Sequence, residues 1–241
     1  MENGQIEFVG GGFCENDDAV SYYEDIIVNM ELGHQFLKKT FNITPTVGWN
    51  IDNFGHTAGH AYLFSQMGFY AQFISRIHYD DWEKRKKEKT LEFIWKPPLS
   101  VPSYLYTYQA FANFYHCPIG FCFESGRCFP TGEYITEDNV KRRAEEFVNY
   151  FREMEQSYRF SNVFQFMGDD MTYQSAGFFF ENIDRLINYI NSHFAEYKMH
   201  MIYSTPSDYL NAIHSELEKQ TPIFPIEPRD LLPIADIPHS Y

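Results

Sequence analysis

The 241-residue sequence is poor in cysteine and in positive charge, and it lacks a long hydrophobic run. It has 4 cysteines, and 19 Lys and Arg residues stand against 33 Asp and Glu residues, which gives a net charge of −14. Nucleic-acid affinity rests mainly on basic side chains, so this balance argues against a nucleic-acid partner. No stretch approaches the ~18 apolar residues that a membrane span needs, so no span is expected.

Several sequence motifs that carry chemistry elsewhere are missing as well. No Ser lies in a G-x-S-x-G elbow, and the glycine run Gly10 to Gly12 lacks the G-x-G-x-x-G spacing of dinucleotide-binding loops. The single basic run, residues 83–89, mixes both signs of charge and is typical of a solvated helix face.

The signs of cellular compartment conflict. The N-terminus lacks the basic and apolar regions of a signal peptide, which predicts a cytosolic chain. Asn42-Ile-Thr44 is a glycosylation sequon, and Cys117, Cys122 and Cys128 form a cluster. In a secreted chain such a cluster indicates a small disulfide loop, and in a cytosolic chain it indicates free thiols or a metal site. No C-x-x-C or H-x-H pair supports zinc at these cysteines.

Aromatic residues, by contrast, are abundant. They make up 19% of a chain that is 44% hydrophobic, enough for a substantial core. Aromatic rings also form sugar-binding surfaces, because the apolar C–H face of a sugar packs on a ring. The aromatic count alone does not decide between a core and a sugar site.

Short apolar runs alternate with segments of helical periodicity along the chain. The expected strands are 5–11, 46–52, 70–76, 91–95, 162–168 and 199–205. The expected helices are 18–39, 57–67, 80–89, 137–157, 178–194 and 207–219, with Thr57, Thr136 and Ser207 as caps. Residues 97–134 show no clear periodicity and are expected to form a long ordered excursion. The alternation predicts an α/β fold with a parallel sheet or barrel.

In such folds catalytic groups gather at the C-terminal ends of strands, and a short set of residues lies there. Asp52 ends one expected strand, Arg76 ends another, and Asp169 and Asp170 follow a third. Two carboxylates are the minimal set for glycoside hydrolysis, and an arginine holds a carboxylate or donates to substrate hydroxyls. Asp also commonly ends a strand or caps a helix, so a purely structural role stays open for each acid.

His56 and His60 have the i,i+4 spacing of a metal-binding pair on a helix. No Glu follows His56, as a metalloprotease would require. We therefore interpret both as structural histidines.

The stretch "GWNIDNFGHT", from Gly48 to Thr57, resembles the pattern G-W-x-I-D-P-F-G-H-S of the glycoside hydrolase family 38 α-mannosidases, and the chain is similar to their lysosomal type. Other matching segments are "NDDAVSYYEDIIVNMELGHQFL", "SRIHY", "LEFIWKP", "MGDDMTYQSA", "YSTPSDYL" and "ADIPHSY". The matches run from about Phe8 to Tyr241. The resemblance implies that residues 1–241 form part of the N-terminal catalytic domain, an incomplete parallel β/α barrel.

The resemblance also implies roles for individual residues. Asp52 falls on the nucleophile, which is also a zinc ligand, and Asp170 falls on the general acid/base. The positions implied to contact substrate are Phe54, Arg76, Asp169 and Tyr115. Cys117 and Cys122 have the spacing of a small disulfide of the family.

The chain departs from the family pattern at its metal site. The H-x-D pair and the histidine of H-H-D, which complete the zinc site in the family, have no counterpart here, and Asn50 and Asn53 replace the usual His and Pro. The implied function is that of a retaining, zinc-dependent α-mannosidase of mannose-containing glycans, lysosomal or lumenal by family. Because only Asp52 remains of the ligands, the isolated chain is expected to be inactive. The alternative is an inactive truncated paralogue or a glycan-binding remnant.

Overall fold

The computed structural model describes residues 3–18, 20–98, 100–124, 130–219, 223–232 and 235. Its strands are β1 (Val47–Asn50), β2 (Ala71–Ile74), β3 (Glu92–Trp95), β4 (Leu105–Gln109) and β5 (Ile226–Glu227). They form one sheet in the order β1-β2-β4-β3-β5. Every pair is parallel except β3 with β4. The predicted α/β class is confirmed, with an open and mostly parallel sheet.

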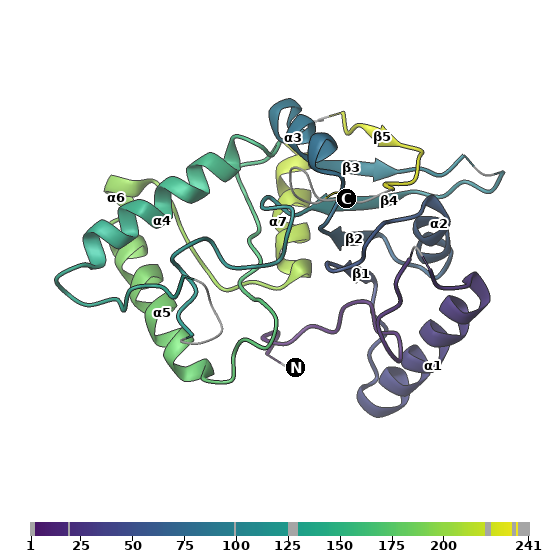
Figure 1. The fold of residues 1–241 in the computed structure, drawn as a ribbon, viewed down its shortest axis with the longest axis horizontal. Helices are drawn as coiled ribbons and strands as arrows, with labels where there is room; N and C mark the ends of the chain where they lie inside the picture. The colour runs from purple at the N-terminus through teal and green to yellow at the C-terminus, as the bar shows by residue number, and fades with distance from the viewer. Residues whose placement is uncertain are drawn as a thin grey trace.

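Seven helices surround this sheet in the described part of the chain. They are α1 (Tyr23–Phe41), α2 (Ala58–Gln66), α3 (Tyr79–Glu88), α4 (Val140–Glu155), α5 (Ala176–Ser192), α6 (Phe194–Tyr197) and α7 (Pro206–Leu217). Figure 1 shows α4, α5 and α6 gathered on one side of the molecule, the sheet with α1 and α2 on the other, and α7 between them. None of the described helices has the length and apolar character needed to cross a membrane.

The helix starts follow local side-chain chemistry. The Thr57 side chain accepts a hydrogen bond from the backbone N–H of His60 and so caps α2, as predicted. The cap of α7 is Thr205, which forms a capping box with Asp208, so the predicted Ser207 cap is wrong. The predicted Thr136 cap is also wrong, because α4 begins only after Asn139.

Three predicted strands, 5–11, 162–168 and 199–205, are not strands in the structure. Their backbone groups bond elsewhere: the Asn191 side chain contacts both the N–H and the C=O of Met201, each at 2.8 Å. In the first segment, the N–H of Gly10 makes one bond to the C=O of Val47. Conversely, β4 lies inside the region that was expected to be irregular.

The core consists of three clusters of buried side chains. One lies under the sheet on the α7 side and includes Phe73, Tyr108 and Tyr209. A second joins α4 to α5, and a third packs α1 and α2 against the opposite side of the sheet. Burying each large apolar side chain stabilises the fold by roughly 1.5–3 kcal/mol. Both faces of the sheet are therefore covered, as expected for parallel strands.

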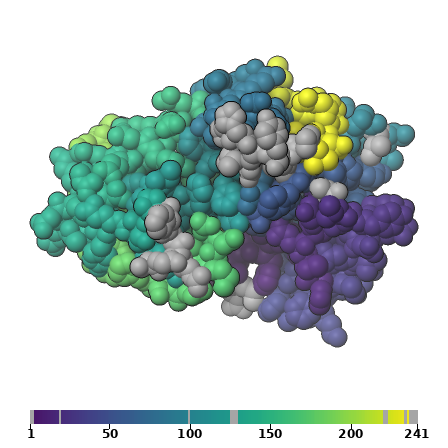
Figure 2. Space-filling model, viewed as in Figure 1, coloured from purple at the N-terminus to yellow at the C-terminus, as the bar shows by residue number. Residues whose placement is uncertain are grey.

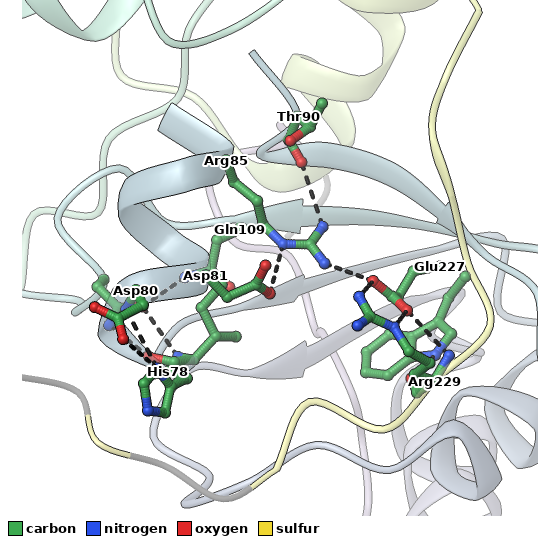
Figure 3. A network of polar contacts seen from close by, with 11 residues as sticks. His78, Asp80, Asp81, Arg85, Thr90, Gln109, Glu227 and Arg229 are labelled. Carbon is green, nitrogen blue, oxygen red and sulfur yellow. Dashed lines mark hydrogen bonds and ion pairs between the residues drawn. The ribbon is translucent and has the colours of Figure 1, made fainter. Parts of the chain in front are cut away.

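An ion-pair network fastens β5 to α3. Arg85 donates from Nη2 to Glu227 Oε2 at 2.6 Å and from Nε to Asp81 Oδ2 at 2.9 Å, and Arg229 also contacts Glu227. Figure 3 shows these four side chains, which we call the β5 network, converging between the helix and the C-terminal strand. In Figure 2 the C-terminal residues, in yellow, lie on the same side of the surface as the blue residues of α3. The network joins segments far apart in the sequence.

Candidate active site

Asp52 and Arg76 meet because β1 and β2 are parallel. Asn50 stands opposite Ile74 in the sheet register, and each site residue lies two positions beyond its strand. The side chains therefore reach the same edge of the sheet, where Arg76 Nε donates to Asp52 Oδ1 at 2.5 Å. The Asp52 side chain keeps 45% of its surface exposed. One oxygen of this carboxylate is held, and a large part of the group remains accessible to a ligand.

The Arg76 guanidinium is fixed by aromatic rings on two sides. Its central carbon lies 4.5 Å from the centroid of the Phe54 ring and 4.3 Å from that of Phe114. The Arg76 backbone adopts φ 50°, a left-handed conformation, and its N–H donates to the C=O of Asn113 at 3.1 Å. The Asn113 side chain also bonds both backbone groups of Ile77, at 3.0 and 2.8 Å. This turn is thus held by Asn113, which lies in the loop after β4, and by both rings.

Tyr115 holds the second carboxylate. Its hydroxyl donates to Asp170 Oδ1 at 2.7 Å. Burial raises the pKa of Tyr115 well above its usual value, and the hydrogen bond to Asp170 and the charges of Asp52 and Asp170 raise it further. The phenol therefore stays protonated as a donor. The charges of both carboxylates therefore act on the pKa of this hydroxyl.

The loop that carries Asp170 is held by short-range hydrogen bonds. The Asp169 carboxylate accepts from the N–H of Asp170 at 2.8 Å, and Thr172 Oγ1 donates to the Asp169 C=O at 2.9 Å. Met171 and Tyr173 have φ values of 58° and 67°, which are unfavourable for residues with a side chain. Such conformations persist only where the surroundings enforce them, and they concentrate at functional sites.

The cysteines differ from the pairing that the resemblance implied. Cys117 is a free, buried thiol and Cys122 is disulfide-bonded, so the expected Cys117–Cys122 disulfide is wrong. Cys128 lies outside the described residues. Cys117 instead supports the Asp170 loop: its N–H donates to the C=O of Gly168 at 3.0 Å. Burial raises the pKa of its thiol to about 12, with a further contribution from the Asp169 charge, so it is no nucleophile at neutral pH.

A cavity of about 730 Å³ opens beside the Asp170 loop. Tyr115 and Asp169 form part of its wall, and most other lining side chains are apolar, among them Trp49, Phe166 and Met201. The volume is ample for a small ligand, and aromatic walls suit the apolar faces of a sugar. Its polar lining includes Asp169 and Thr172 of the Asp170 loop, together with Gln165 and Asp208 from other segments.

The residues that the structure describes do not supply a metal centre: they contain no group of three or more His, Cys, Asp or Glu side chains placed to hold a metal ion. His56 and His60 are buried and face Asp18 rather than Asp52. This placement agrees with their interpretation as structural histidines.

Sequence reasoning missed three side chains that shape the site. Phe114 flanks Arg76, Asn113 fixes the Arg76 turn, and Asp18 contacts the loop that carries Asp52. Asp18 is part of the matching segment "NDDAVSYY", but the expected helix 18–39 gave it no inward role. Only the tertiary structure brings the three to the site.

Comparison with known proteins assigns the chain to a family. The model of the N-terminal domain of glycosyl hydrolases family 38 matches residues 1–227. The chain is 39% identical over 242 residues to a lysosomal alpha-mannosidase of Dictyostelium discoideum and 36% identical over 246 residues to an alpha-mannosidase of Canavalia ensiformis. Both matches cover 100% of this chain and 24% of the relative, so the chain spans about a quarter of their length.

The fold comparison agrees. The crystal structure of an alpha-mannosidase from Enterococcus faecalis matches 92% of this chain and 22% of that chain, with a TM-score of 0.65 and 18% identity. At this identity the likeness shows the fold alone. The family match and the sequence relatives together show that this chain belongs to glycosyl hydrolases family 38 and corresponds to part of their N-terminal domain.

Proposed function

We propose that this chain carries the catalytic carboxylates of a retaining α-mannosidase that removes terminal α-mannosyl residues from glycans. Two contacts support the proposal: Asp52 with Arg76 at one edge of the sheet, and Asp170 with Tyr115. Two carboxyl groups that face one space are what glycoside hydrolysis requires. The names of the relatives supply the sugar.

In this proposal Asp52 is the nucleophile and Asp170 is the general acid/base. Arg76 holds Asp52 Oδ1, which leaves Oδ2 to attack the anomeric carbon. Tyr115 holds Asp170 Oδ1, which leaves Oδ2 to protonate the departing oxygen and then to deprotonate water. Two successive displacements at the same carbon retain its configuration. We expect the two carboxyl groups to lie nearer the ~5–5.5 Å of retaining enzymes than the wider inverting separation.

Substrate contacts are proposed for the groups around the carboxylates. Phe54 is 57% exposed and presents a ring on which the apolar face of a mannosyl unit can pack. Asp169 and Tyr115 line the cavity edge, where their oxygens can meet sugar hydroxyls. Arg76 is proposed as a further substrate contact because its guanidinium lies beside the Phe54 ring, 4.5 Å from the centroid.

Zinc dependence is part of the proposal through Asp52 and through ligands that the described residues do not supply. Asp52 is the one position that the family resemblance assigns to zinc, and a catalytic zinc normally has three protein ligands. The described residues around it do not form such a site, so no step here is derived through the metal. We infer that the isolated chain is inactive and that the remaining ligands lie elsewhere in a complete enzyme.

The incomplete donor set also favours a second candidate, a remnant that binds glycan without cleaving it. The test compares residues 1–241 with a form extended to include the family's H-x-D and H-H-D segments, both assayed with an aryl α-mannoside and zinc. We expect turnover only in the extended form, with loss on Asp52→Asn. Turnover by the short form would contradict the inferred inactivity, and absence of turnover in both would favour the remnant.

The configuration of the product tests the retaining mechanism. Methanolysis by the active form should yield the methyl α-mannoside, and the β-anomer would contradict retention.

The names of several relatives include "lysosomal", so a lysosomal or other lumenal compartment is proposed for the complete protein.

A further inference from the structure

We propose that Asp18 is a positioning residue that holds the Asp52–Arg76 ion pair in place through Asn53 and His56. The proposal rests on the role proposed above for Asp52, but it concerns geometry and is tested without activity. Asp18 is buried, with 2% of its side chain exposed, and lies 34 positions before Asp52 in the sequence. Its two carboxylate oxygens contact three residues of segment 53–60, which directly follows Asp52.

The first contact fixes the residue next to Asp52. Asn53 Nδ2 donates to Asp18 Oδ1 and to the backbone C=O of Asn16, both at 2.8 Å. Asn53 is itself buried, so both protons of its amide are used inside the protein. A buried amide without partners is unfavourable, and this requirement ties the position of Asn53 to segment 16–18.

A second set of contacts connects Asp18, through the histidines, to the backbone next to Arg76. Asp18 Oδ2 lies 3.1 Å from His60 Nδ1 and 3.8 Å from His56 Nδ1. His56 Nε2 lies 2.7 Å from the C=O of Ser75, and a carbonyl only accepts, so Nε2 carries the proton. Ser75 precedes Arg76, and its hydroxyl donates to the C=O of Ile51, which precedes Asp52. The chain of contacts therefore ends at the backbone on both sides of the ion pair.

Charge supports the same arrangement. Burial alone would raise the pKa of Asp18, but the charge of His60 and the contacts with both histidines lower it, so the group stays a carboxylate. The pKa of Glu15 is raised by burial and by the charges of Asp52 and Asp18. The charges of both acids thus act on one side chain.

An anchor of this kind is needed because Asp52 lies beyond the end of β1, outside the strand ladder. An exposed carboxylate on an irregular loop would sample many positions, whereas catalysis requires a fixed one. The buried side chains of Asp18, Asn53 and His56 supply the constraint that the sheet does not.

The test reads the Arg76 Nε–H signal in nitrogen-15 NMR spectra of the full chain, assigned by its loss in Arg76→Lys. In the unaltered protein we expect slow exchange with water, because this proton is bonded to Asp52. Asn53→Leu removes the amide at similar size, and we expect exchange to accelerate about tenfold or more. Asp18→Ala should act in the same direction, and the double change should be less than additive. If Asp18→Ala does not fold, Asn53→Leu decides.

Glu227→Gln is the matched control, because it also alters a buried carboxylate with hydrogen-bonded partners but lies in the β5 network. It should lower stability and leave the Arg76 signal within about twofold of its original exchange rate. The proposal is overturned if Asn53→Leu leaves the signal unchanged or if Glu227→Gln accelerates exchange as much. Absence of mannosidase activity in the extended form would count against the proposed function, and the NMR result would still test the positioning role of Asp18.

Discussion

Two arginine–carboxylate pairs with nearly the same contact distance stand in opposite surroundings. Arg76 and Asp52 meet at 2.5 Å with 13% and 45% of their side chains exposed, and Arg85 and Glu227 meet at 2.6 Å with 7% and 6% exposed. The buried pair has further partners in Asp81 and Arg229, whereas the exposed pair is bordered by rings and leaves much of its carboxylate open. The same contact holds the fold together in one place and presents a reactive group in the other.

Asp52→Asn should produce the largest effect, and this effect should be a loss of activity with little change in stability. In a catalytically competent extended form, removal of the proposed nucleophile should lower kcat by more than about a thousandfold. The pair is partly exposed, so the free energy of unfolding should change by no more than about 1 kcal/mol. Enzyme assays and urea unfolding of the same preparation measure both quantities. A large stability loss would show that this pair is structural after all.

Arg85→Met should produce the reverse result. It leaves Glu227 buried with less compensation, and breaking such a pair lowers the free energy of unfolding by roughly 3–5 kcal/mol. Urea unfolding monitored by tryptophan fluorescence measures the loss. Arg76→Met is the matched comparison and should cost less than about 1 kcal/mol. Equal losses in the two variants would remove the distinction between the pairs.

The part of the site nearest the strands was predictable because sequence position determined it. Asp52 and Arg76 follow apolar runs at the same offset, and parallel pairing then brings them together. β4 escaped prediction because it carries buried polar side chains: Thr107 accepts a hydrogen bond from Gln72 of β2, and Gln109 donates to Asn113. These buried polar side chains interrupt the hydrophobic alternation on which the prediction depended.

The errors near Asp18 and at residues 199–205 have a related cause. Asp18 was assigned to a helix, but α1 begins at Tyr23, and the carboxylate instead turns toward segment 53–60. The run 199–205 has the apolar pattern of a strand, yet the Asn191 side chain takes the backbone groups of Met201. A propensity pattern cannot identify which distant side chain will take a backbone hydrogen bond.

Two buried glutamates should contribute pH dependences of opposite sign to the free energy of unfolding. Burial raises the pKa of Glu92, despite hydrogen bonds from Tyr106 and Tyr209, so its favourable contribution is present below the unfolded value of about 4.3 and is lost as pH rises through the folded pKa. The pKa of Glu227 is lowered by Arg229 and Arg85 against the effect of burial, so its contribution is lost as pH falls.

The free energy of unfolding of Glu92→Gln and Glu227→Gln, measured over roughly pH 3–8, separates the two contributions. The free energy of unfolding of Glu92→Gln, compared with that of the unaltered chain, should increase as pH rises. The same difference for Glu227→Gln should increase as pH falls. Parallel curves for the two variants would show that neither environment shifts its carboxyl as described.

The smallest expected effect concerns the rings that border each arginine. Arg76 lies 4.3 Å from the Phe114 centroid near the surface, and Arg85 lies 4.6 Å from the Phe93 centroid in the interior. A cation–π contact is worth about 0.5–1 kcal/mol when exposed and about 2 kcal/mol when desolvated. Double-mutant cycles of Phe114→Leu with Arg76→Met and of Phe93→Leu with Arg85→Met measure each coupling through the free energy of unfolding. We expect the buried coupling to exceed the exposed one, since water weakens the attraction of Arg76 to its ring. If the Phe114 coupling proved the larger, the ring would be fixing Arg76 more firmly than its exposure suggests, and the two pairs would differ less in kind than their burial implies.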